Sequence, residues 1–412
     1  MRDFKMLNNS AIAVIKSTVP VLETKGTAIT KRFYELLFAG HPELLNVFNH
    51  ANQKQGRQQA ALANAVYAAA AHIDRLHEIL PAVRQIAHKH RSLGIKPEHY
   101  PIVGETLLAA IKDVLGDAAT DEILAAWAEA YGVIADAFIG VEAGMYREAE
   151  AQPGGWAGFR PFTIRRRVKE SGAITSFYLS PADGGPLASF KPGQYVSVKA
   201  DIPGQANTHI RQYSLSDAPG KPHYRISVKR ETHAGERPDG IVSNYLHDSA
   251  GEGDTLLLSA PAGDFVLDES HPLRPVVLLS GGVGLTPMMS MLLHLTAAQS
   301  ERPVTFIHAA ANGRVHAFRE DVRRIAERCS RVRAYFCYSE PTDEDRAGGV
   351  FDKEGRIDLP WLQTIVPSPD ADFYFCGPVS FMQRIYRDLR GLGAAPSDIR
   401  YEFFGPSGSL DA

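Results

Sequence analysis

The sequence predicts a multidomain fold in which an all-α domain is followed by an antiparallel β-barrel domain and then by an α/β domain with a parallel sheet. Three changes of pattern along the 412 residues support this order. Helical periodicity comes first, short apolar runs separated by Pro and Gly turns come second, and long apolar runs that alternate with helical patterns come third. We expect the domains to span residues 1–150, 151–268 and 269–412.

The composition argues against several partners and compartments. A formal net charge of −3 and a pI near 6.6 show no basic excess, which disfavours nucleic acid or an anionic membrane surface as a partner. Cys329, Cys337 and Cys376 are too few and too scattered for a disulfide framework or a thiolate metal site. Lys16 interrupts the first apolar run, so the N-terminus matches neither a signal peptide nor a membrane span. We therefore expect a cytoplasmic protein, with Met6 as an alternative start.

One helix of the first domain carries two histidines in the stretch QIAHKHRSLG. One of them shares a face with apolar residues at spacings of three and four: Val83, Ile86, His90 and Leu93. His88 and Lys89 lie on the opposite side of this helix and are expected to face water. The pattern allows His90 to be either a hydrogen-bonded core residue or a metal ligand, and the core residue is the commoner case.

Three further polar side chains fall on apolar helix faces: Tyr34 beside Phe33, Leu36 and Leu37; Gln58 beside Leu62, Ala65 and Val66; and Glu142 beside Trp127, Tyr131, Ile134, Phe138 and Met145. A polar group buried without a partner costs about 2–7 kcal/mol, so Glu142 is expected to have one. The alternative for Glu142 is a side chain at the helix end that reaches solvent near Arg147.

The second domain follows a linker rich in Gly, Pro and aromatic residues, AEAQPGGWAGFRPF. Within this domain the motif PGQY precedes RQYSL, which begins at Arg211. An arginine fork matches a phosphate in a bidentate manner, while Tyr213 and Ser214 can pack against and hydrogen-bond a flat ring with polar edges. These residue types fit a flavin dinucleotide, although they also fit an ordinary amphipathic strand.

The third domain opens with VVLLSGGVGLTPMMSMLLHL, which predicts a strand, a Gly-rich turn and a helix with Thr286 as N-cap and Pro287 at the first helical position. Gly281, Gly282 and Gly284 let the backbone approach a ligand, and the N–H groups of the helix N-terminus suit a pyrophosphate. Pro287 replaces the third glycine of G-x-G-x-x-G, and a plain strand-to-helix turn is the alternative.

Two motifs near the end of the chain have a similar character. FYFCGPVSFM places Cys376, Gly377 and Pro378 at another strand-to-helix turn, and the last motif is YEFFGPSG. A Cys–Gly pair permits the close approach of a ring, and an aromatic side chain can cover a ring face. Each motif is also compatible with an ordinary turn that has no role in binding.

PGQY, RQYS, SGGVGLTP, CGP and the terminal aromatic-Gly-Pro occur in the order found in the ferredoxin-reductase-like superfamily, which this part of the chain resembles. The resemblance implies two cofactor sites. FAD would be held by Tyr195, Arg211, Gln212, Tyr213 and Ser214 and covered by Phe403, Phe404, Gly405 and Pro406. NADH or NADPH would be held by Gly282, Val283, Gly284, Leu285, Thr286 and Pro287 together with Cys376 and Gly377.

The whole chain is similar to the bacterial flavohaemoglobins, on the motifs FNHANQKQGRQ, AHKHRSLGIKPEHY, AWAEAYGV and GGW together with those of the reductase. This resemblance implies a globin domain that binds haem b, with His90 as the proximal iron ligand. Tyr34, Gln58 and Leu62 would line the distal side, and Tyr100 and Glu142 would hydrogen-bond the proximal imidazole. Three features depart from the family pattern. Leu285 stands where many relatives have a polar Gln, Gly281 stands where they have Ala, and the segment HAGERPDG is longer than usual.

The activity implied by the resemblance is that of a nitric oxide dioxygenase. Electrons would pass from NAD(P)H through FAD to the haem, and ferrous-oxy haem would oxidise nitric oxide to nitrate. The flavin is needed because hydride carries two electrons and iron accepts one. Nitric oxide and dioxygen would be the substrates, with no obligate protein partner and a monomeric chain. The alternatives are a gas-binding sensor and a reductase that acts on peroxides, quinones or another acceptor. Arg314 either meets a 2′-phosphate or lies in an exposed turn.

Overall fold

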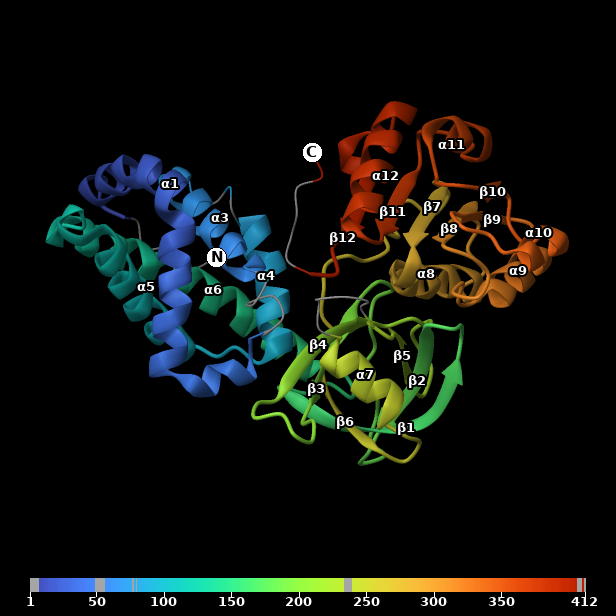
Figure 1. Ribbon diagram of the computed structural model, residues 1–412, viewed down its shortest axis with the longest axis horizontal. Coiled ribbons are helices and arrows are strands. Elements are labelled where there is room, and N and C mark those ends of the chain that lie inside the picture. Colours follow the sequence, from blue (N-terminus) through green and yellow to red (C-terminus); the bar gives the residue numbers. More distant parts are fainter. Residues whose placement is uncertain are drawn as a thin grey trace. The chain divides into compact units, whose positions relative to one another are not determined.

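The computed structural model describes residues 7–48, 56–75, 78, 80–232, 239–405 and 410 of the chain. Figure 1 shows the elements in chain order, with helices at the blue end and two sheets with their helices toward the red end. The chain divides into two compact units, and each is described by itself. The first comprises Met1–Arg160 and Lys199–Arg211, and the second comprises Pro161–Val198 and Gln212–Ala412.

The first unit contains the predicted helices: α1 (Asn9–Gly40), η1 (Pro42–Asn46), α3 (Arg57–Ala71), α4 (Leu80–Leu93), α5 (His99–Leu115), η3 (Gly116–Ala118) and α6 (Asp121–Ala151). Asn8 caps α1 because its side-chain oxygen accepts the N–H of Ala11 at 2.7 Å. Thr120 caps α6 in the same way. The all-α prediction for this part of the chain is confirmed.

The helical core forms where α1 packs against α3, α5 and α6. Buried side chains of α1, among them Ile15, Phe33 and Leu37, meet Trp127 of α6 in this core. By length and composition alone α6 is apolar enough to cross a membrane, but a core helix passes the same test. Trp127 and Glu142 of α6 are buried within the helical unit.

The buried face of α4 differs from the prediction. Val83, Ala87 and Arg91 are buried, whereas Ile86 is 36% exposed and His90 and Leu93 are half-buried. Because the small Ala87 lies one turn after Val83, this line of the helix can pack closely against α6. The apolar stripe therefore marks a face next to the packed one. His88 and Lys89, predicted to meet water, are half-buried, so this prediction is confirmed only in part. In α3, Ala65 is exposed rather than inward.

The antiparallel sheet contains β1 (Phe159–Lys169), β2 (Ile174–Pro181), β3 (Tyr195–Ala200), β4 (His209–Ser214), β5 (Tyr224–Lys229) and β6 (Thr255–Ser259), with α7 (Ile241–Asp248) between β5 and β6. The strand order is β4-β3-β6-β1-β2-β5. A bridge between Leu215, directly after β4, and Ile226 in β5 joins the two edges, which closes the sheet into the predicted barrel. Phe162, Ile164, Phe177 and Val196 are fully buried in the barrel strands.

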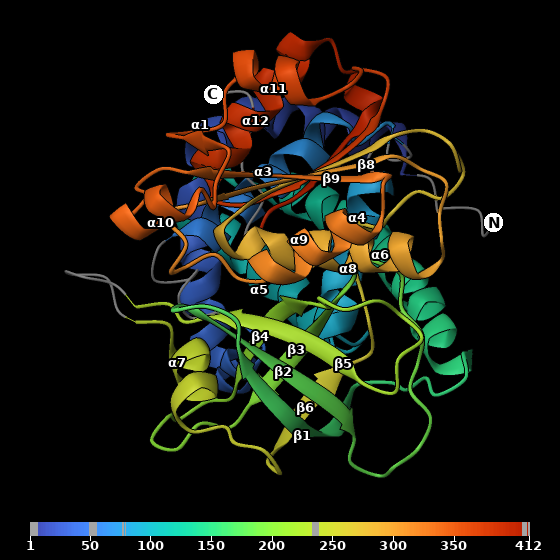
Figure 2. The ribbon, with the colours of Figure 1, turned by 90° about the vertical axis from the view of Figure 1, so that its right-hand side faces the viewer.

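The parallel sheet has the order β10-β9-β8-β7-β11-β12. Its elements are β7 (Val276–Gly281), η4 (Gly282–Gly284), α8 (Leu285–Ala297), β8 (Val304–Ala310), α9 (Arg319–Arg328), β9 (Val332–Tyr338), α10 (Asp343–Gly348), β10 (Lys353–Glu354), α11 (Leu359–Ile365), β11 (Asp372–Cys376), α12 (Val379–Leu392), η5 (Pro396–Asp398) and β12 (Ile399–Glu402). Figure 2 shows α11 and α12 on one face of this sheet and α8 and α9 on the other. Helices on both faces explain why the central strands are apolar on both sides.

Candidate functional site

Three side chains from three helices meet in the helical unit. His90 comes from the last turn of α4, Tyr100 from the first turn of α5 and Glu142 from the second half of α6. Oε1 of Glu142 lies 2.8 Å from Nδ1 of His90 and accepts the hydroxyl of Tyr100 at 2.6 Å. Nδ1 of His90 is 3.3 Å from the same hydroxyl. The shorter distance and the anionic acceptor favour a bond from Nδ1–H of His90 to Glu142.

The carboxylate of this cluster is buried and the histidine is partly open. The side chain of Glu142 is 4% exposed and that of His90 is 32% exposed. The solvent-reaching alternative for Glu142 near Arg147 is therefore wrong, and its predicted partner is present. Both contacts of His90 use Nδ1, so Nε2 is the nitrogen that remains to donate a lone pair to a metal.

Three tyrosines, one buried and two half-buried, support the cluster. Burial, together with the hydrogen bond to Glu142, raises the pKa of Tyr100 far above that of a free tyrosine, so its hydroxyl stays a donor. Tyr131 donates to the backbone oxygen of Tyr100 at 2.7 Å, and burial raises its pKa as well. Tyr146 donates to the backbone oxygen of Ile95 at 2.7 Å, and burial raises its pKa to about 12. These bonds hold the corner between α4 and α5 against α6.

Sequence reasoning missed part of this support. Tyr146 lies four residues after Glu142, one turn along the same helix. This spacing places both side chains on one face and could have indicated that Tyr146 lies near the cluster. Gly104 was also missed, and a Cβ at that position would lie 2.5 Å from the ring of Tyr131. Glycine is therefore required for Tyr131 to reach α5. Sequence alone does not predict such a contact between distant helices.

The predicted distal residues lie on α1 and α3, two helices that pack together. Tyr34 is 6% exposed and sits among aromatic rings, with the ring centroid of Phe33 at 4.9 Å and those of Phe38 and Phe48 at 5.7 Å. Gln58 and Leu62 are half-buried in the first two turns of α3. Thr30 of α1 donates to the backbone oxygen of Gln59 at 2.9 Å, which ties the two helices at this level. Residues 49–55 of FNHANQKQGRQ lie outside the described residues.

The predicted flavin residues occupy β3 and β4 of the barrel. Tyr195 begins β3 and is 9% exposed, and a Cβ on Gly263 would lie 3.0 Å from its ring. Ser214 is buried, while Arg211, Gln212 and Tyr213 are half-buried. Arg211, Gln212 and Tyr213 are therefore partly accessible to a ligand. Gln212 donates to Oγ of Ser197 at 3.0 Å, and Nη1 of Arg211 donates to the backbone oxygen of Ile210 at 2.8 Å.

The two predicted strand-to-helix turns of the α/β domain lie side by side. β7 and β11 are neighbours in the sheet, and Ser280 pairs with Cys376. A Cβ on Gly284 would lie only 2.2 Å from the backbone oxygen of Cys376, and a Cβ on Gly377 would lie 2.6 Å from the ring of Phe381. Both glycines are thus required by close packing. The structure brings together the two halves of the predicted pyridine nucleotide site, at the edge where ligands of such sheets bind.

Thr286 does not cap the helix as predicted. α8 begins at Leu285 with Gly284 as its N-cap, and the hydroxyl of Thr286 donates to the backbone oxygen of Val283 at 3.1 Å. The reason is that the 3-10 turn Gly282–Gly284 continues directly into the helix, so the helix begins one residue before Thr286. Pro287 is therefore the third residue of the helix and not the first. Proline is still tolerated, because the first-turn N–H groups have no partner within the helix.

The remaining motifs lie at or near the same edge. Phe403 and Phe404 follow β12, which pairs with β11 so that Glu402 is opposite Cys376. Phe403 is half-buried, Phe404 is 46% exposed, and Pro406 lies outside the described residues. Burial raises the pKa of the Cys376 thiol, so this thiol stays protonated. Residues 233–238 of HAGERPDG also lie outside the described residues.

Of the two alternatives for Arg314, contact with a 2′-phosphate or an exposed turn, the structure shows an exposed side chain. Its side chain is 72% exposed, and Nη2 lies 3.6 Å from the carboxylate of Glu344.

Three family models match successive parts of the chain. Globin matches residues 31–138, the oxidoreductase FAD-binding domain matches residues 163–267, and the oxidoreductase NAD-binding domain matches residues 278–387. A protein named Flavohemoprotein from Bacillus cereus (strain ATCC 10987 / NRS 248) is 61% identical over 405 residues, which is 98% of this chain and 100% of that protein. The Flavohemoprotein of Bacillus subtilis (strain 168) is 56% identical over 98% of this chain and 99% of its own length.

Two solved structures are similar to all or part of this chain. The flavohemoglobin from Malassezia yamatoensis, solved with bound FAD and heme, is similar over 97% of this chain and 100% of its own, with a TM-score of 0.83 and 29% identity. The FAD/NAD-binding domain of a nitric oxide dioxygenase from Vibrio cholerae O1 biovar El Tor covers 60% of this chain and 99% of its own, with a TM-score of 0.55 and 40% identity.

Proposed function

The chain belongs to the flavohemoprotein family, and from that membership we propose that it is a nitric oxide dioxygenase. It is an oxidoreductase that combines a globin domain with FAD-binding and NAD-binding domains. The proposed reaction uses NADH or NADPH and dioxygen to convert nitric oxide to nitrate. We propose domain boundaries at residues 1–150, 151–268 and 269–412, and the matched spans fall inside them.

The observation that carries the proposal is the contact between His90 and Glu142. A carboxylate that accepts Nδ1–H makes the imidazole a stronger electron donor through Nε2. A haem held through Nε2 of His90 would supply the iron chemistry that activates dioxygen, and a strongly donating imidazole favours activation over simple storage. Tyr100 holds the same carboxylate oxygen from the other side at 2.6 Å, which keeps Glu142 aimed at His90.

The residues around His90 fit a haem. Among the described residues no group of three or more His, Cys, Asp or Glu side chains gathers to hold a bare metal ion, whereas one axial histidine is what a haem takes from a globin. Ile86 is 36% exposed one turn before His90, and Phe138 lies 5.6 Å from the ring of His90 between centroids. Leu62 and Val66 of α3 are also partly buried. Apolar side chains next to an available Nε2 suit a large apolar ring.

Tyr34 and Gln58 are proposed to orient the gas substrates. A phenol and an amide on the apolar faces of α1 and α3 can donate hydrogen bonds to a partly negative oxygen species, and fixed donors of this kind stabilise developing charge. Tyr34 is held in place by the rings around it, so its hydroxyl direction is restricted.

The reductase part of the proposal assigns the nucleotide residues. FAD would be bound by Tyr195 and the segment Arg211–Ser214, and Phe403 and Phe404 would cover its ring. NAD(P)H would be bound at the turn from Gly282 to Pro287 next to Cys376 and Gly377. The packing of Gly284 against the backbone oxygen of Cys376 supports this assignment, because it holds the two turns together at one edge of the sheet.

The test is nitric oxide consumption by the holoprotein with NADH, with and without dioxygen, while the haem Soret band is recorded. Rapid loss that requires both NADH and dioxygen supports a dioxygenase. An intact Soret band without such loss, alongside fast reduction of an artificial acceptor, indicates a reductase for another acceptor instead. His90→Ala serves as the control, because it should lose haem and keep FAD.

A further inference from the structure

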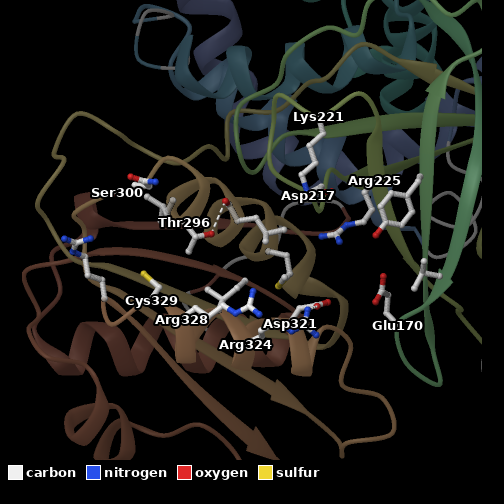
Figure 3. Close-up of a pocket in the computed structure, with 18 of the residues that line it drawn as sticks. Glu170, Asp217, Lys221, Arg225, Thr296, Ser300, Asp321, Arg324, Arg328 and Cys329 are labelled. Carbon is white, nitrogen blue, oxygen red and sulfur yellow. Dashed lines mark hydrogen bonds and ion pairs between the residues drawn. The ribbon is translucent and has the colours of Figure 1, made fainter.

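The second unit contains a cavity apart from both nucleotide motifs. Its volume is about 820 Å³, within the roughly 300–1,000 Å³ of small-molecule sites. β1, β2 and β5 of the barrel line one side, and α8 and α9 of the α/β domain line the other (Figure 3). The lining of α8 starts at Met289 and continues to Thr296, so it lies past the turn Gly282–Gly284 and toward the opposite end of the helix.

The charges that line this cavity do not cancel. They are Arg166, Lys221, Arg225, Arg324, Arg328 and Arg331 against Glu170, Asp217, Glu301 and Asp321. Three of the acids are ion-paired with lining cations: Asp217 with Lys221 at 2.6 Å, Asp321 with Arg324 at 3.2 Å, and Glu301 with Arg331. Within the described parts of the chain, Arg166, Arg225 and Arg328 form no ion pair, although the charge of Arg225 also acts on Asp217 and Glu170. The cavity therefore has an excess of positive charge.

One of the unpaired cations is fixed in the wall. Arg225 is 7% exposed, its Nε donates to Oγ of Ser216 at 3.1 Å, and its Nη2 donates to the backbone oxygen of the same residue. Its guanidinium carbon lies 4.7 Å from the ring centroid of Phe318. These bonds occupy two of its three nitrogens, so Nη1 remains to bind an anion without losing the bonds that orient the side chain.

A second arginine, Arg166, lies close to an aromatic ring that Arg225 also approaches, that of Tyr178. The guanidinium carbon of Arg166 lies 4.2 Å from the ring centroid of Tyr178, and that of Arg225 lies 5.9 Å from it. The two guanidinium groups thus both lie next to the ring of Tyr178. On the other side of the cavity α9 presents Arg324 and Arg328, and Figure 3 shows them across the cavity from Arg225.

The apolar part of the lining comes mainly from the two helices: Met289 and Leu293 of α8 and Ile325 of α9, with Val168 of β1. We propose that this cavity binds an organic anion with an apolar or aromatic body, whose acidic head meets Arg166 and Arg225 and whose body lies against Met289, Leu293 and Ile325. A ligand of this class satisfies the excess positive charge and covers the apolar wall at once. Glu170 opposes the charge of the ligand.

The probe for the test is 8-anilinonaphthalene-1-sulfonate, an aromatic anion whose fluorescence rises in apolar surroundings. It is titrated into the protein loaded with haem and FAD in the presence of saturating NAD+, so that the nucleotide sites are filled. We expect saturable binding that decanoate displaces and inorganic phosphate does not. Displacement of the probe by NAD+, or by phosphate and not by decanoate, would overturn the proposal.

Two charge variants with opposite expected effects sharpen the test. Arg166→Gln should weaken probe binding and Glu170→Gln should strengthen it, each by roughly threefold to tenfold. Arg333→Gln, an exposed arginine of β9 outside the cavity lining, should leave the affinity unchanged. General destabilisation would shift both cavity variants in the same direction, and that result would contradict the assignment. Arg166 is exposed, so its replacement leaves the packing of the barrel intact.

Discussion

Oε1 of Glu142 lies 2.8 Å from Nδ1 of His90 on another helix, and the carboxylate is almost completely buried. The two residues are 52 positions apart in the sequence. Because a buried carboxylate without partners is costly, α4 and α6 are held in one register by this contact. The contact also sets the electron donation of the imidazole, so the same pair serves the fold and the proposed chemistry.

Glu142→Gln tests that chemistry. The amide has nearly the same shape but carries no negative charge, so the imidazole becomes a weaker donor. We expect the reduction potential of the haem iron to rise and nitric oxide turnover to fall roughly tenfold to a hundredfold. Spectroelectrochemical titration measures the potential. Glu148→Gln, at an exposed position of the same helix, is the control and should change neither quantity.

The burial of Tyr100 should make the folded chain less stable at alkaline pH. Its pKa is raised in the folded chain above the 10.0 of a free tyrosine, so the folded state binds more protons than the unfolded state above that pH. The contribution of Tyr100 to the free energy of unfolding is therefore fully present below pH 10, and the free energy of unfolding should fall as the pH rises further. In Tyr100→Phe this fall should be shallower, as measured by denaturant titration between pH 8 and 11. An identical slope in both proteins would show that Tyr100 is not buried as described.

Gly284→Ala tests the junction of the two nucleotide turns. The added Cβ would lie 2.2 Å from the backbone oxygen of Cys376, so one turn must move. We expect the KM for NADH to rise at least about tenfold, with flavin reduction by NADH slowed in stopped-flow measurements. Haem and FAD content should be unchanged. Gly348→Ala provides a comparison in the same domain, since its Cβ would meet only a side-chain methyl of Val350 at 3.2 Å. Equal effects of the two variants would argue against the proposed nucleotide turn.

Arg211→Ala tests the flavin phosphate assignment. Loss of a bidentate donor should lower FAD occupancy of the purified protein and slow haem reduction by NADH, while the haem content stays normal. The ratio of flavin to haem absorbance measures this directly. Arg165→Ala, an exposed arginine of β1, should keep its flavin. Normal flavin content in Arg211→Ala would remove the phosphate role from this residue.

The order of three domain types was predictable because each pattern follows from which faces of its elements are buried. The cluster of His90, Tyr100 and Glu142 was implied by the family resemblance, and the apolar stripe of α6 supported the burial of Glu142. The packed face of α4 was not predictable, because an apolar stripe shows where water is excluded and does not distinguish a helix neighbour from a cofactor. The N-cap of α8 was also misplaced, since Thr286 satisfies the cap preference while the preceding 3-10 turn decides where the helix begins.

The most direct test of the dioxygenase is the ratio of nitrate formed to NADH consumed by the holoprotein under dioxygen and nitric oxide. Conversion of nitric oxide and dioxygen to nitrate requires one electron, and NADH supplies two through the flavin, so we expect a ratio of about two. NADH oxidation without nitrate, or a product that is mainly nitrite, would contradict it.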